Sequence, residues 1–209
     1  MTRLFQLPSP CLIYHFTALE NLPAILTSGG LVCKSRASPS VDISDGGIQG
    51  RRARRKVEAG PGGVLHDYVP FYFTPKSPMI HRIFKQDRAD GTVVQKRLVY
   101  LVSSVENVAA LSLPFAFTDG HAEMRVDVRY FDNKADLVHL DWRVIRAAGW
   151  NGDEQRRKRQ SEFLIHGAAP LSVLLGFATQ SEAAQNEVEQ LLEQYGVTLW
   201  GGVRPGWYY

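Results

Sequence analysis

One carboxylate in this sequence lies at the start of an apolar segment, where burying its charge would destabilise the fold unless it has partners or a function. Glu162 begins the apolar run 162–166 and directly follows the polar, charged segment 149–161. A glutamate at the head of a buried strand must be satisfied by partners or carry a function. The same residue could instead lie at an exposed strand edge. Glu162 is therefore a candidate for chemistry that needs a positioned carboxylate.

Two further segments have residue types that could hold a ligand. Residues 14–17, with the sequence YHFT, stand where a predicted strand meets a helix. A histidine beside a hydroxyl can grip a sugar or an amide there, although His15 also suits a satisfied core position and Thr17 an ordinary helix N-cap. In 67–74, the three aromatic residues at 71–73 alternate between the faces of a strand. One face could stack on a flat heterocycle or pack in the core.

Motifs of several other chemistries are absent from the sequence. There is no GxxxxGK[ST], no GxGxxG after a strand, no HExxH or CxxC pair and no GxSxG. Cys11 and Cys33 lack metal-ligand spacing and are interpreted as reduced core residues. The sequence thus predicts no metal site, and nucleotide binding through a Rossmann or P-loop fold is excluded.

The basic residues are concentrated although the net charge is only +3. Two local clusters in a nearly balanced chain suggest contact with a polyanion, while two solvated loops would give the same pattern. The clusters contain Arg51, Arg52, Arg54, Arg55 and Lys56, and then Arg156, Arg157, Lys158 and Arg159.

The elements that must position these residues follow from the apolar periodicity. Helices are predicted after Thr17, which forms a capping box with Glu20, and over 77–84, 136–148 and 181–195, with a turn at 105–110. A long excursion over 34–63 carries a short helix at 48–55. The predicted strands cover 12–16, 31–33, 69–73, 98–103, 114–118, 162–166 and 173–179, with an edge strand over 197–200.

Many short strands with scattered helices predict an α+β fold. The 209 residues suit a single domain, 1–209, with 44% hydrophobic residues. No stretch approaches the roughly 18 apolar residues of a membrane span. The first residues do not read as a secretory signal, so a cytoplasmic location is expected.

Together these segments resemble the DarT family of DNA ADP-ribosyltransferase toxins, from bacterial toxin–antitoxin modules. No single motif is decisive, but their order and spacing are specific, and they cover nearly the whole chain. The marks are IYHFT at 13–17 with Asn21-Leu22, IQGRR at 48–52, GGVLHDYVPFYF at 62–73, PKSPM at 75–79, PFAFTD at 114–119, QSEFL at 160–164 and WYY at 207–209.

The resemblance implies the ADP-ribosyltransferase fold, a split, mostly antiparallel β-sheet core with peripheral helices that clamps NAD+ in a cleft. It implies that Glu162 is the catalytic glutamate and that His15 contacts the nicotinamide ribose or amide. The cofactor-binding set it implies is His15, Thr17, Asn21, Phe71 and Tyr72. No metal is implied.

The acceptor implied by the resemblance is a thymine base in single-stranded DNA, read within a short sequence motif. Arg52 would polarise the base, with Arg51 as the alternative. The implied DNA-binding residues are Gln160, Arg54, Arg55, Arg156, Arg157, Lys158 and Arg159. The implied partner is a macrodomain antitoxin that removes the ADP-ribose. Another acceptor (guanine, RNA or protein) and a non-catalytic nucleic-acid-binding module are the alternatives.

Overall fold

The structure is a computed structural model and describes residues 7–209. Within these residues an eight-stranded sheet has the order β10-β9-β4-β1-β3-β7-β5-β6, and β2 and β8 form a separate pair. Neighbouring strands are antiparallel except β9 and β10. The strands are β1 Leu12–Ala18, β2 Gly30–Val32, β3 Tyr68–Tyr72, β4 Leu98–Ser104, β5 Phe115–His121, β6 Tyr130–Phe131, β7 Ser161–His166, β8 Ala168–Pro170, β9 Gly176–Thr179 and β10 Gly201–Val203.

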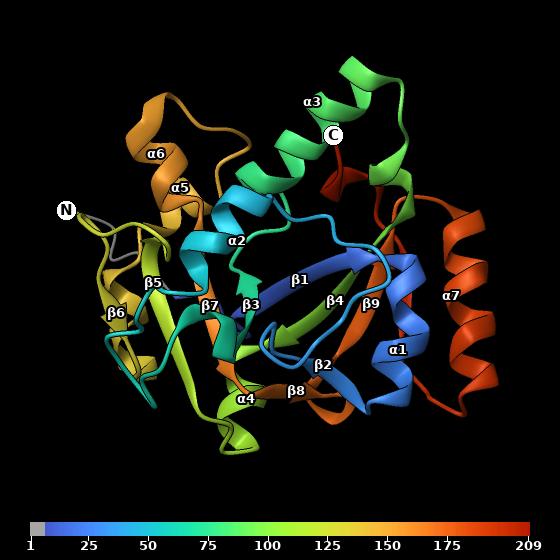
Figure 1. The fold of residues 1–209 in the computed structure, drawn as a ribbon, viewed down its shortest axis with the longest axis horizontal. Helices are drawn as coiled ribbons and strands as arrows, with labels where there is room; N and C mark the ends of the chain where they lie inside the picture. Colours follow the sequence, from blue (N-terminus) through green and yellow to red (C-terminus); the bar gives the residue numbers. More distant parts are fainter. Residues whose placement is uncertain (1–6) are drawn as a thin grey trace.

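Helices surround the sheet (Figure 1), with α1 and α7 beyond β9 at one end and α5 and α6 beside β5 at the other. Short 3-10 helices lie among them at Leu19–Asn21, Leu65–Asp67, Val94–Arg97, Lys134–His139, Leu171–Val173 and Pro205–Trp207. The α-helices are α1 Leu22–Thr27, α2 Gly46–Arg52, α3 Pro78–Asp90, α4 Val105–Ala110, α5 Trp142–Ile145, α6 Gly152–Lys158 and α7 Glu182–Gln194.

The sheet is split where β1 meets β3. β1 pairs with β4 along all seven of its residues, and β3 pairs with β7 along all five. Between β1 and β3, however, the register holds only the pair Tyr14↔Tyr72. The two halves of the sheet therefore diverge beside this pair, which confirms the predicted split, mostly antiparallel core.

Helices cover both faces of the sheet, and β4 shows why. All seven of its residues are buried, as expected for a central strand without a solvent face. Val99 and Leu101 pack in one apolar cluster with residues of α1 and α7. Leu98 and Tyr100 pack in a second cluster with Ile80 and Ile83 of α3. The two clusters anchor the half of the sheet that carries β1.

Most predicted elements are present with small shifts of their ends. The strands predicted at 12–16, 69–73, 98–103, 114–118 and 162–166 are β1, β3, β4, β5 and β7, and the helix at 181–195 is α7. Ser181 caps α7, since its side chain accepts a hydrogen bond from the amide of Ala184. These segments combine clear periodicity with clear termini, which explains the agreement.

The predicted capping box at Thr17 and Glu20 is wrong. Thr17 belongs to β1, and the following 3-10 helix begins at Leu19 after Ala18, without a side-chain cap. The Thr17 hydroxyl instead accepts a hydrogen bond of 2.9 Å from the Asn21 side chain. Pairing with β4 extends the strand by two residues past the predicted end, so tertiary structure overrides the local cap signal.

Three other expectations need correction. The helix predicted over 136–148 is two short pieces, because Leu140 between them is extended. The segment 149–161, expected as a loop, contains α6. The edge strand expected over 197–200 is not formed, and β10 begins at Gly201 instead. In each case a few residues were assigned from a weak pattern whose outcome depends on packing.

None of the helices in residues 7–209 is long and apolar enough to cross a membrane. In the same part of the chain, no three His, Cys, Asp or Glu side chains come together as a metal site would require.

Candidate active site

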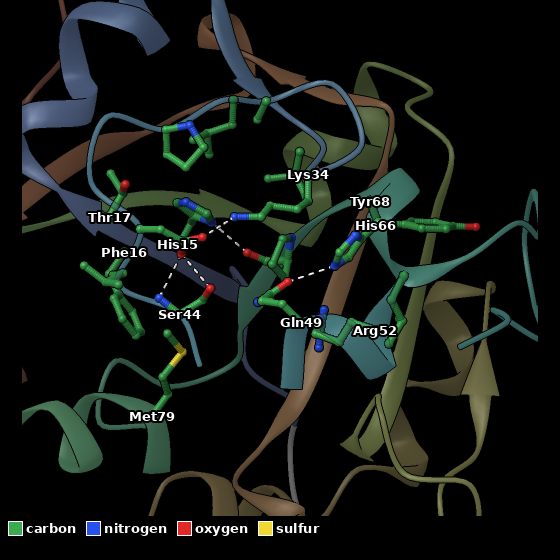
Figure 2. A pocket seen from close by; sticks show the side chains of 18 of the residues that line it. His15, Phe16, Thr17, Lys34, Ser44, Gln49, Arg52, His66, Tyr68 and Met79 are labelled. Atoms are coloured by element: carbon green, nitrogen blue, oxygen red, sulfur yellow. Dashed lines mark hydrogen bonds and ion pairs between the residues drawn. The ribbon is translucent and has the colours of Figure 1, made fainter. Parts of the chain in front are cut away.

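A cavity of about 470 Å³ opens at the split between the two halves of the sheet. This volume lies in the range of about 300–1,000 Å³ that is usual for ligand sites. Its walls come from β1, β3 and the segment 34–49, which includes the first residues of α2. In Figure 2, His15 and Thr17 lie on one side, with Gln49 and Arg52 of α2 on the other. Strand ends and a long excursion thus enclose a ligand-sized space.

Glu162 and Arg52 form a buried ion pair in the wall of this cavity. Pairing of β7 with β3 sets Glu162 opposite Tyr72, and Arg52 is the last residue of α2. The two guanidinium Nη atoms donate to the two carboxylate oxygens at 3.0 and 2.9 Å. Oε1 also accepts from the amide of Ala122 at 3.1 Å. The side chains are only 8% and 2% exposed, so the pair is both bidentate and shielded from water.

The charges of this pair hold each other in the ionised state. Burial by itself would raise the pKa of Glu162, but Arg52 and then His121 outweigh burial and hold that pKa below its ordinary value. Burial likewise would lower the pKa of Arg52, and the Glu162 carboxylate reverses the effect. The cavity therefore presents a carboxylate that is ionised at neutral pH and already oriented.

His15 contributes a neutral imidazole. Its Nδ1 lies 2.8 Å from the carbonyl oxygen of Pro70, and since a carbonyl can only accept, Nδ1 carries the proton. Burial lowers the pKa of His15, an effect only partly opposed by this hydrogen bond. Nε2 is then left as an acceptor on a residue that lines the cavity. The imidazole also bridges the split, because His15 lies on β1 and Pro70 on β3.

Asn21 fastens the 34–49 segment across the cavity. Its Nδ2 donates to the carbonyl of Val41 at 2.8 Å, and its Oδ1 accepts from the amide of Val41 at 2.9 Å. The same Nδ2 donates to Thr17. All three residues line the cavity, and Asn21 is 5% exposed. Asn21 thus ties β1 to the loop above it.

Comparison with known proteins identifies the fold and the family. Residues 14–209 match the family model described as "ssDNA thymidine ADP-ribosyltransferase, DarT". The chain belongs to the DarT family. The predicted family, fold and enzyme class, that of a DNA ADP-ribosyltransferase, are thereby confirmed.

Relatives and solved structures agree over nearly the whole chain. A DNA ADP-ribosyl transferase of Thermus sp. strain 2.9 is 39% identical, covering 97% of this chain and 98% of the relative. Another, from Escherichia coli O127:H6, is 35% identical, covering 97% of this chain and 95% of the relative. The structure of Thermus sp. 2.9 DarT with ADP-ribosylated single-stranded DNA matches with a TM-score of 0.92 at 38% identity, covering 97% and 98%. The structure of the same protein with NAD+ matches with a TM-score of 0.87 at 37% identity, covering 98% and 100%.

Among the DarT marks, the aromatic strand divides between the cavity and the core. Tyr72 lines the cavity, stacks on Phe16 with ring centroids 6.0 Å apart, and donates to the Met79 sulfur at 3.6 Å. Phe71 does not line the cavity. It is 0% exposed and belongs to the main apolar cluster. Its ring packs against that of His15, with centroids 5.6 Å apart, so it lies behind a residue that lines the cavity, and its predicted contact with the cofactor stays a prediction.

The structure separates the two arginines that the sequence left as alternatives. Arg52 turns inward to Glu162, whereas Arg51 pairs with Glu123 and its side chain is 57% exposed. Of the neighbouring basic residues, Arg54 is exposed. Arg55 pairs with Glu58 and lies over a tyrosine ring. The helix α2 thus directs one arginine of the cluster into the site and leaves the others outside it.

The basic run before Glu162 also divides. Gln160 and Arg156 line the cavity. Arg157 donates to the carbonyl oxygen of Asp127, and Lys158 pairs with Asp141 and Glu154. Arg159 is 1% exposed. Its guanidinium donates to the carbonyls of Val144, Ala147 and Lys76. This side chain ties three segments together beneath the surface, and the DNA contact predicted for it stays a prediction.

Sequence reasoning missed several residues at the site. His121 lines the cavity near Glu162 and is coupled electrostatically to it. The predicted strand ended at 118, three residues short of His121, although β5 continues to it. His66 and Gln49 also line the cavity and share a hydrogen bond of 2.8 Å. A histidine outside a predicted element gives little signal, so geometry was needed to find them.

Proposed function

We propose that this chain transfers ADP-ribose from NAD+ to a thymine base of single-stranded DNA within a short sequence motif. The family description names ADP-ribosyl transfer to thymidine in single-stranded DNA, which supports the proposed acceptor. One relative, Thermus sp. 2.9 DarT, has been solved both with NAD+ and with ADP-ribosylated single-stranded DNA, at 37–38% identity to this chain. The observation that carries the proposal is the bidentate pair of Glu162 and Arg52 in the wall of a ligand-sized cavity.

The reaction needs an ionised carboxylate in a dry site. The bond between the nicotinamide nitrogen and C1′ of the ribose breaks, and its electron pair leaves with nicotinamide. The ribose becomes oxocarbenium-like until a thymine ring nitrogen bonds to C1′ and loses its proton to solvent. Glu162 is proposed to hold the ribose 2′-hydroxyl and to stabilise the developing positive charge. Its low pKa and burial suit both tasks.

Arg52 is proposed to stabilise the thymine as it loses its proton. A guanidinium carries five N–H donors, and the hydrogen bonds to Glu162 occupy one donor on each Nη atom. The remaining donors are available to a carbonyl oxygen of the base, which makes the ring nitrogen more acidic. Arg51 is assigned no such role, because it pairs with Glu123 outside the site.

NAD+ is proposed to lie along β1 and β3. The acceptor Nε2 of His15 suits a ribose hydroxyl or the amide N–H of nicotinamide, with Tyr72 beside it. Thr17 and Asn21 complete this wall, Asn21 by holding the loop that covers it.

The DNA strand is proposed to enter past Gln160 and Arg156, which line the cavity. Arg54, Arg55, Arg157 and Lys158 are proposed to attract the phosphates at longer range. A single strand presents its bases without the cost of unpairing a duplex.

The test is incubation with NAD+ and a panel of single-stranded and double-stranded oligonucleotides of differing sequence, read by gel shift and mass spectrometry. The proposal predicts an added ADP-ribose on thymine in some single strands and no addition to the matching duplexes. Addition to guanine, RNA or protein would replace the proposed acceptor. Absence of nicotinamide release with every nucleic acid would favour a non-catalytic binding module.

We further infer a role as the toxin of a toxin–antitoxin module, acting as a single cytoplasmic domain whose partner is a macrodomain protein that removes the ADP-ribose. Family membership supports this role. Induced expression is expected to arrest bacterial growth, and co-expression of a macrodomain hydrolase is expected to relieve the arrest. Unimpaired growth with labelled DNA would contradict the toxin role alone.

A further inference from the structure

A cluster of aromatic rings lies just outside the catalytic cavity, where it plays no part in the chemistry above. His81 of α3 contacts Trp150, which precedes α6, and Tyr209, with ring centroids 5.2 and 4.9 Å apart. Phe84 extends the cluster, 5.8 Å from Tyr209. We name His81, Trp150 and Tyr209 the aromatic patch. Its three members are each half-buried, so none of them is sealed inside the core.

Two cations lie against the aromatic patch, the half-buried Lys76 and the buried Arg159. The Lys76 ammonium lies 4.9 Å from the centre of the Tyr209 ring, and the Arg159 guanidinium lies 5.5 Å from that of Trp150. Burial and then the charges of Lys85 and Arg156 lower the pKa of His81. The patch therefore combines neutral rings with a positive local field, the composition of surfaces that bind single-stranded nucleic acid.

The aromatic patch is continuous with the mouth of the cavity. Met79 and Arg82 of α3 line the cavity, and His81 lies between them in sequence. Arg156 of α6 also lines the cavity and acts on His81. The same two helices thus form one side of the mouth and carry the rings beyond it. Figure 1 shows the chain before α6 passing close to α3 at this point.

We propose that the aromatic patch binds the base of one nucleotide adjacent to the reactive base, chiefly by stacking on Trp150. This inference rests on the proposed function, since it takes single-stranded DNA as the substrate. Stacking tolerates any base, because each has a flat π face. The patch therefore contributes affinity and position to the strand, while residues in the cavity select the reactive base.

The first experiment uses the wild-type enzyme and a set of reactive single strands, each with one abasic nucleotide at a different position. Removal of the base that stacks on Trp150 should raise the KM for DNA by about 5- to 150-fold, the usual effect of losing one base–aromatic stack. The sensitive position should be one of the two neighbours of the target. The proposal would be overturned if removing the base at either neighbouring position left the KM for DNA equal to that of the intact strand.

The second experiment compares variants on the same strands. Trp150→Ala should raise the KM for intact DNA by a similar factor, leave the KM for NAD+ unchanged, and abolish the penalty of the abasic neighbour. Trp150→Phe keeps a ring and should stay within about threefold of the wild type. Trp200→Ala is the matched control, because Trp200 is 83% exposed and directly precedes β10, an edge strand of the sheet. It should change neither KM.

The outcomes separate this inference from the proposed function. If the wild type labels DNA but the abasic penalty persists in Trp150→Ala, the aromatic patch does not stack the neighbour and only this inference fails. If Trp150→Ala does not fold, His81→Ala replaces it and should reduce the same penalty; an unreduced penalty there also overturns the inference. If the wild type labels no single-stranded DNA, the proposed function itself fails.

Discussion

Replacing Arg52 by alanine leaves the Glu162 carboxylate buried without the partner that neutralises it. Glu162 is 1% exposed and loses both of its hydrogen bonds to the guanidinium, while the hydrogen bond from the Ala122 amide remains. Removing one partner of a buried pair usually costs about 3–5 kcal/mol. The free energy of unfolding of Arg52→Ala at pH 7 should therefore fall by about 3–5 kcal/mol.

The loss should depend on pH with a definite sign. In the wild type the pKa of Glu162 is held below the ordinary value of 4.5. The pair therefore stabilises the fold above that pH, and this contribution is lost as the pH falls through the lowered pKa. In Arg52→Ala, burial dominates and raises the folded pKa above 4.5. The variant should then be relatively most stable in acid and lose stability as the pH rises through that raised pKa.

The assay is urea unfolding between pH 4 and pH 8, followed by tryptophan fluorescence. The difference in unfolding free energy between wild type and Arg52→Ala should widen as the pH rises through this range. The double variant Arg52→Ala with Glu162→Gln removes the unpaired charge and should be more stable than Arg52→Ala at pH 7. A difference that is constant with pH, together with equal stability of the single and double variants, would refute the reasoning that Glu162 is ionised in the fold.

Three further variants test individual placements. Arg51→Ala should keep DNA labelling within about threefold of the wild type, since Arg51 is largely exposed, whereas a loss of labelling in this variant would restore Arg51 as the acting residue. Phe71→Ala should lower the unfolding free energy by about 3–5 kcal/mol and leave the KM for NAD+ unchanged in the folded fraction; a selective rise in that KM would support the cofactor contact predicted for Phe71. Asn21→Ala frees Val41 and should raise the KM for NAD+ about tenfold with a smaller change in kcat; the reverse split would contradict the loop-holding role.

Segments with strong periodicity were predictable from the sequence, and segments whose structure depends on distant partners were not. β4 and α7 combine apolar patterns with clear ends and are found where expected. Thr17 carries an equally clear local signal, yet pairing with β4 keeps it in a strand. The polar residues of α6 indicated a loop, because the helix has no buried residue to create a pattern.

The site shows the same division. Glu162 stood out because a carboxylate began an apolar strand, and the structure explains its presence by the buried partner Arg52. That partner is 110 residues away in sequence, so pairing could not be derived from local pattern. Arg159 lies in a basic run typical of phosphate-binding segments. Its burial among backbone carbonyls depends on the tertiary structure and leaves no local signal in the sequence. His121 had no local signal at all.

The most direct test of the account is the single-turnover rate of ADP-ribose transfer by Glu162→Gln. Glutamine keeps the shape of the side chain and an acceptor for Arg52 but removes the negative charge. The account predicts that the Kd for NAD+ stays within a few-fold of the wild type, while transfer to a reactive single-stranded oligonucleotide slows by about 10²-fold or more. Transfer by Glu162→Gln at the wild-type rate would contradict the central role of this carboxylate.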